Sequence, residues 1–101
     1  MAANFYISKL LDRYGKLLSE KQYRILDGYY NNDLSLSEIA ENEGITRQGV
    51  SDFVKRSEAQ LLEYEQKLRL CENETALKNA AEGFKNGQLE LSALLEIIEK
   101  L

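Results

Sequence analysis

Apolar residues recur along most of the chain at steps of three and four, the repeat that places side chains on one face of an α-helix. The first such series comprises Ile7, Leu10, Leu11, Tyr14, Leu17 and Leu18. It predicts a helix over roughly residues 3 to 17. A second helix is predicted to begin after Ser19, because Gln22 completes a capping box three positions later, and to end near Tyr30.

The inward face of this second helix is predicted to hold Tyr23, Leu26 and Tyr30, with Ile25 and Tyr29 alongside. Exposed tyrosine rings can also stack on unpaired bases, but rings at helical spacing among Ile and Leu more often fill a core. Lys21 and Arg24 lie on the other side of the helix. Cations in such a position contact phosphates or, more often, simply face water.

Residues 34–56 have the spacing of a helix-turn-helix. Ser35 and Glu38 form a second capping box, so the first helix of the motif is predicted to begin after Ser35 and to turn Ile39 inward. Gly44 then falls in the turn between the two helices, where a residue without a Cβ adopts a positive φ at no steric cost.

The second helix of the motif is predicted to be capped by Thr46 and to direct Val50 toward the core, together with Phe53 or Val54. This orientation leaves a polar and partly basic set outward, namely Arg47, Gln48, Ser51 and Lys55. Amide and guanidinium groups on such a helix can contact base edges in a DNA major groove, and hydroxyl groups can contact phosphates. The same angle between two helices also occurs in modules that bind only proteins.

The apolar repeat continues well beyond the motif, through Val50, Val54, Ser57, Leu61, Tyr64, Leu68 and Cys71. It predicts one long helix from Arg47 to about Asn73, roughly 40 Å in length, which is more than a small three-helix core can cover. The far half of this helix therefore needs a partner. The C-terminal region of the same chain or the same helix of a second subunit could supply it.

Residues 74–101 are predicted to form two further helices. The first begins at Glu74, ends at Asn86 and Gly87, and has an inward face of Ala76, Leu77, Ala80, Ala81 and Phe84. The second covers residues 89 to 101 and is unusually apolar, so part of its surface is expected to be buried against another chain. The domain organisation is thus residues 1–73, a helix-turn-helix domain that includes the long helix, and residues 74–101, a helical extension packed on that helix or on a second subunit.

The composition supports an all-α fold and argues against an enzyme. The chain has no proline and is rich in residues that favour helices, and it lacks the alternating runs of β-branched residues that strands need. With no histidine and a single cysteine, Cys71, we expect no catalytic residues, no metal site, no cofactor and no internal disulfide. The sequence shows neither a long apolar run nor a cleavable leader, so a cytoplasmic location is expected.

Charge is distributed unevenly along the chain. The formal charge is −4, yet residues 1–56 hold eight Lys or Arg against eight Asp or Glu, whereas residues 57–101 hold five against nine. The half that contains the helix-turn-helix is therefore neutral rather than basic. Sequence-specific binding of a duplex would then need a second copy or a partner.

Several segments of the chain resemble region 4 of bacterial sigma factors, namely 17–22, 29–30, 33–40 and 44–48. With Val50 and segments 55–58 and 62–68, the chain more closely resembles the YlxM-like family of small bacterial helix-turn-helix proteins. The resemblance covers roughly residues 6 to 70. It implies a sigma-region-4-like helix-turn-helix bundle with a long fourth helix, and an accessory or regulatory protein that binds DNA or RNA. Because the genes of this family commonly lie beside that of the signal recognition particle GTPase, it also implies a link to that targeting pathway.

Carried over by the resemblance, the expected nucleic-acid face is Thr46, Arg47, Gln48, Ser51 and Lys55, with Arg56 near the phosphate backbone. The chain departs from the pattern at Glu43, where helix-turn-helix proteins usually have an apolar residue, at Gly49, which weakens the helix, and at Asp52, which repels phosphates. One alternative is a protein-interaction adaptor that uses the acidic, leucine-rich C-terminal helices without binding nucleic acid. Another is a dimeric operator-binding repressor.

Overall fold

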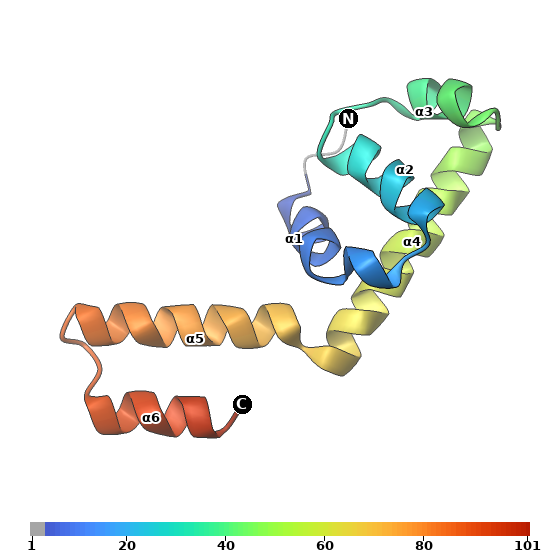
Figure 1. Cartoon of the computed structure of the whole chain (residues 1–101). Coiled ribbons are helices and arrows are strands. Elements are labelled where there is room, and N and C mark those ends of the chain that lie inside the picture. The colour runs from blue at the N-terminus through green and yellow to red at the C-terminus, as the bar shows by residue number, and fades with distance from the viewer. Residues whose placement is uncertain (1–3) are drawn as a thin grey trace. The chain divides into compact units, whose positions relative to one another are not determined.

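A computed structural model of the chain describes residues 4–101, which form six α-helices, one 3-10 turn and no strand. The helices are α1 (Phe5–Tyr14), α2 (Glu20–Tyr30), α3 (Leu36–Glu43), α4 (Arg47–Leu68), α5 (Leu70–Lys85) and α6 (Leu91–Glu99), and the 3-10 turn is Gly15–Leu17 (Figure 1). The chain divides into two compact units, Met1–Leu68 and Arg69–Leu101. The predicted all-α class is confirmed.

In the first unit, α1, α2 and α3 all contact α4, which runs the length of the unit (Figure 1). The side chains that are completely or almost completely buried include Leu10, Tyr14, Leu26, Val50 and Leu61. Burying a side chain of this size contributes about 1.5–3 kcal/mol. The long helix is therefore the common surface on which the other three helices are fixed.

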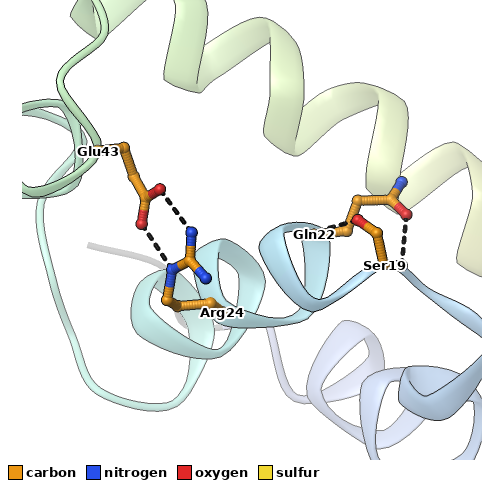
Figure 2. A network of polar contacts seen from close by, with 4 residues as sticks. All are labelled: Ser19, Gln22, Arg24 and Glu43. Atoms are coloured by element: carbon orange, nitrogen blue, oxygen red, sulfur yellow. Dashed lines mark hydrogen bonds and ion pairs between the residues drawn. The ribbon is translucent and has the colours of Figure 1, made fainter.

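Both predicted capping boxes are present. The Ser19 hydroxyl accepts a hydrogen bond from the Gln22 backbone N–H at 3.1 Å, and the Gln22 side chain accepts one from the Ser19 N–H at 3.0 Å (Figure 2). Ser35 and Glu38 repeat the arrangement at 3.0 and 3.1 Å. These bonds satisfy N–H groups that have no partner within the helix, and they start α2 and α3 where the sequence predicts.

The first helix and one aromatic residue differ from the prediction. Residue 3, the expected start of the first helix, lies outside the described residues, and the α-helix ends at Tyr14 in a 3-10 turn rather than reaching residue 17. Tyr23 was expected inward but is 42% exposed. Its ring lies over Gly15, so close that a Cβ there would be 2.6 Å from a ring carbon. Tyr23 thus covers the turn at the surface, while Leu26 fills the core.

The long helix ends at Leu68, earlier than the expected end near Asn73. Arg69 adopts a left-handed backbone with φ 56°, which interrupts the helical hydrogen-bonding pattern, and α5 begins at the next residue. The last apolar position of the predicted long helix, Cys71, therefore belongs to α5.

In the second unit, α5 and α6 lie side by side and are joined by a turn in which Gly87 has φ 72° (Figure 1). Among the described residues of this unit, only Cys71 and Ala80 are buried, and α6 has no buried residue. Leu77 and Phe84, expected inward, are 38% and 43% exposed because two helices alone cannot enclose a core. Within the described part of the chain, no helix combines the length and the apolar character needed to cross a membrane.

Candidate nucleic-acid interface

The turn between α3 and α4 has the geometry that the sequence predicts. Gly44 has φ 68° and ends α3 in the left-handed conformation. The Ile45 backbone N–H then returns a hydrogen bond to the Ala40 carbonyl at 3.1 Å. At the start of α4, the Thr46 hydroxyl accepts from the Gly49 N–H at 2.9 Å, as expected for a cap. The turn fixes where α4 begins.

The buried side of α4 determines which residues face outward. Val50, Val54, Ser57 and Leu61 are buried, at steps of four and three. The predicted set lies outside this buried stripe: Thr46, Arg47, Gln48, Lys55 and Arg56 are exposed, and Ser51 is half-buried. The first three turns of α4 and its cap thus bring the six predicted residues onto a single helix.

Two residues of this surface are already bonded to each other. The Gln48 side-chain amide donates to Asp52 Oδ1 at 3.0 Å, and both side chains are exposed. Gln48 is the predicted residue best suited to contact a base edge, so this bond must open before its amide can bind a base. Asp52 also places a negative charge between cations, in a shallow hollow lined by Gly49, Lys55 and Arg56.

A basic and aromatic cluster adjoins the outer face of α4. Lys21 Nζ on α2 lies 5.5 Å from the centre of the Phe53 ring, and Arg56 Cζ lies 5.8 Å from the same centre. Both distances are within the range of cation–π attraction. The pattern along the chain holds no signal for this cluster, because Lys21 and Phe53 come from helices that are far apart in sequence.

Glu43, which occupies a usually apolar position of the motif, is paired with Arg24. The guanidinium of Arg24 donates to both carboxylate oxygens of Glu43, at 2.8 and 2.7 Å (Figure 2). The Glu43 side chain is only 12% exposed. The hydrogen bond from Arg24, aided by the charges of Arg24 and Lys21, holds the pKa of Glu43 below its ordinary value despite partial burial. The pair joins α2 to α3, so Arg24 serves the fold here.

A four-helix unit with a glycine turn between α3 and α4, and a polar outer face on α4, defines a helix-turn-helix protein. Over residues 1–101 the chain matches the family UPF0122, described as "Putative helix-turn-helix protein, YlxM / p13 like", and it belongs to that family. The predicted resemblance to the YlxM-like family is confirmed. Membership suggests a regulatory role through nucleic-acid binding, and the family is not one of enzymes.

Relatives in clostridia and related bacteria are similar over most of the chain. The UPF0122 protein of Clostridium kluyveri is 47% identical over 83 residues, which are 82% of this chain and 75% of the relative. Those of Clostridium acetobutylicum and Acetivibrio thermocellus are 49% and 53% identical over 72 residues. These 72 residues are 71% of this chain and 62% of each relative, so less than two thirds of these two relatives is matched.

Proposed function

We propose that the chain binds DNA or RNA through the face formed by Thr46, Arg47, Gln48, Ser51, Lys55 and Arg56. The observation that supports this face is the exposure of three cations, Arg47, Lys55 and Arg56, on a helix whose other side is fixed in the core by Val50 and Val54. Exposed cations on such a helix neutralise phosphates, and the helix itself fits a DNA major groove.

The two polymers would use this face differently. In duplex DNA, the first turns of α4 enter the major groove and Gln48 contacts a base edge once its bond to Asp52 opens. The major groove of A-form RNA is too narrow for side chains to read, so contacts to phosphates and to unpaired loops dominate there. Arg47 and Lys55 are expected to matter for both polymers, and Gln48 mainly for DNA.

The cellular role that we infer is that of an accessory or regulatory protein of the signal recognition particle pathway, acting in the cytoplasm. The resemblance to the YlxM-like family supports this inference through the gene neighbourhood it implies. Sequencing of nucleic acid crosslinked to the protein in its own cell tests it. Enrichment of the particle's RNA would support the pathway, whereas enrichment of promoter DNA alone would favour an operator-binding repressor.

A second candidate function is that of a protein-interaction adaptor, favoured by the surface of α6. Leu91, Leu95, Ile98 and Leu101 are each about half exposed, beside the acidic residues Glu96 and Glu99. An apolar surface rimmed by charges is typical of a protein-binding site. The partner we infer is a second copy of the chain or a component of the targeting pathway, and it would dock on α6 and the long helix.

The Arg47→Ala, Lys55→Ala double variant tests the α4 face. Its binding to a duplex DNA and to a structured RNA is measured by fluorescence anisotropy over about 0.05–0.2 M salt. The salt slope is the change in the logarithm of the binding constant with the logarithm of the salt concentration. Losing two phosphate contacts is expected to reduce the magnitude of this slope for the duplex by about 1.8. If the unmodified chain and the variant bind the duplex equally near 1 M salt, the variant should bind it about 60-fold more weakly at 0.1 M.

The matched control is the Lys67→Ala, Lys78→Ala double variant, which changes the formal charge equally. Both control lysines are ion-paired, Lys67 with Glu63 and Lys78 with Glu74, and neither belongs to the proposed face. Unchanged affinity in the Arg47, Lys55 variant would contradict the proposed face. Absence of binding by the unmodified chain to either polymer would favour the adaptor.

A further inference from the structure

We propose that the nucleic-acid face extends beyond the helix-turn-helix onto α2, where Lys21, held with Arg56 against Phe53, contacts the phosphodiester backbone beside the strand segment bound by α4. This inference rests on the proposed function and assigns to the interface a residue outside the motif. Its ligand is the phosphate backbone that DNA and RNA share.

The first support is the geometry around Phe53. Arg56 lies one turn after Phe53 on the same helix, and Lys21 reaches the ring from α2, so the ring holds cations from two helices within 6 Å of its centre. Contact with an aromatic face limits the positions that these long side chains sample. Binding a phosphate then requires less additional ordering than binding by freely moving lysines would.

The second support is that these two cations form no close ion pair, although the charge of Lys21 is felt at Glu43. Among residues 4–101, no carboxylate oxygen lies within the 4.0 Å ion-pair distance of Lys21 or Arg56. The nearby Glu43 uses both of its oxygens to bind Arg24. By contrast, Lys67, Lys78 and Lys100 each contact a carboxylate. Two cations without a close ion pair thus meet at the junction of α2 and α4.

The third support is continuity with the proposed face. Among the shallow hollows that Arg56 lines, two concern this face. One lies along α4 and is also lined by Lys55, and the other lies between α2 and α4 and is also lined by Lys21 and Phe53. The two hollows therefore meet at Arg56, which connects the α4 face to Lys21 on α2. Phosphate contacts at the edge of a recognition helix are those that fix its orientation on the polymer.

The fourth support is that Lys21 does not stabilise the helix on which it lies. It is in the first turn of α2, where the backbone carries a partial positive charge that disfavours a cation. The N-terminal turn is capped by Ser19 and Gln22 and does not need Lys21. The position of Lys21 is therefore not explained by stabilisation of α2, and a role in binding accounts for it.

The test is the Lys21→Ala variant of the full chain, titrated with duplex DNA and with a hairpin RNA by fluorescence anisotropy over about 0.05–0.2 M salt. Loss of one phosphate contact is expected to lower the duplex salt slope by about 0.9 and to weaken binding about eightfold at 0.1 M. Lys21→Arg should retain the slope. Thermal unfolding of Lys21→Ala should change little, because removing a cation from the helix N-terminus offsets the lost attraction to Glu43 and Phe53.

Lys67→Ala is the matched control, since it removes one positive charge from the last turn of α4, where Lys67 is ion-paired with Glu63. An unchanged slope in Lys21→Ala, together with weakened binding in the Arg47, Lys55 variant, would overturn this inference alone and leave the proposed function standing. An equal loss in Lys67→Ala would also overturn it, because the effect would then report only net charge. No binding by the unmodified chain would overturn both.

Discussion

Glu43 and Glu58 are two carboxylates whose surroundings move their pKa in opposite directions. The hydrogen bond from Arg24 lowers the pKa of Glu43, whereas partial burial on α4 raises the pKa of Glu58. A carboxylate with a lowered pKa stabilises the fold at pH values above its ordinary pKa of 4.5, and this stability is lost as the pH falls through the pKa of the folded state. A carboxyl group with a raised pKa stabilises the fold at pH values below 4.5, and this stability is lost as the pH rises through the pKa of the folded state.

Neutralising each carboxylate is therefore expected to have opposite effects at pH 7. Glu43→Gln should lower the thermal midpoint at pH 7, and its effect should shrink below the ordinary pKa of 4.5. Glu58→Gln should raise the midpoint at pH 7 and change it little in acid. Thermal unfolding followed by circular dichroism at both pH values measures this, with Glu41→Gln as an exposed control on α3. If the thermal midpoints of both variants shifted in the same direction at pH 7, the opposite pKa shifts of Glu43 and Glu58 would be contradicted.

The long helix α4 is tied to α1 by a buried polar contact as well as by apolar packing. The Tyr14 hydroxyl donates to Glu65 Oε1 at 2.5 Å, and the Tyr14 side chain is completely buried. The contact joins the end of α1 to the far half of α4, beyond the part of α4 that carries the proposed face. The hydroxyl and the carboxylate thus satisfy each other in a region shielded from water.

Removing the hydroxyl is expected to destabilise the first unit. Tyr14→Phe leaves a buried carboxylate oxygen without this donor and should lower the free energy of unfolding by about 1.5–3 kcal/mol, measured by urea denaturation. Tyr6→Phe, at a residue that is 50% exposed, should change it little. A loss for Tyr14→Phe no larger than that for Tyr6→Phe would show that the bond adds nothing to the docking of α1.

The bounds of α2 and α3 were predictable, because Ser19 with Gln22 and Ser35 with Glu38 mark helix starts through local chemistry. The outward residues of α4 were predictable because apolar residues at steps of three and four mark its buried side. The break at Arg69 was not predictable, because the apolar repeat runs through it and neither Gly nor Pro marks it. Contacts between distant helices, such as Lys21 with Phe53 and Arg24 with Glu43, depend on tertiary packing and leave no spacing signal.

Considered together, the two units differ in how much apolar surface they bury. The first encloses a core around α4, whereas the second has two buried residues among those described, neither of them on α6. The excess of negative charge also lies in the second part of the sequence, residues 57–101. This division fits the proposal that one part binds nucleic acid while the other binds a partner chain.

Disrupting the apolar surface of α6 is expected to separate proposed dimers without loss of fold. Leu95 and Ile98 are 47% and 45% exposed, so Leu95→Lys with Ile98→Lys should leave the helical content unchanged. Light scattering should then report a dimer for the unmodified chain and a monomer for the variant. Exchange of two exposed polar residues, Gln66→Lys with Asn79→Lys, is the control. A monomer in every case would exclude this self-association.

The Arg24–Glu43 pair links the identities of two positions that are distant in sequence. A largely buried carboxylate at position 43 is tolerated because the guanidinium at position 24 binds both of its oxygens. Where a relative has an apolar residue at 43, the cation at 24 loses this role. Aligned sequences of the family should therefore show covariation, with a basic residue at 24 when 43 is acidic and other residues at 24 when 43 is apolar. Independent variation at the two positions would show that the pair is dispensable for joining α2 to α3.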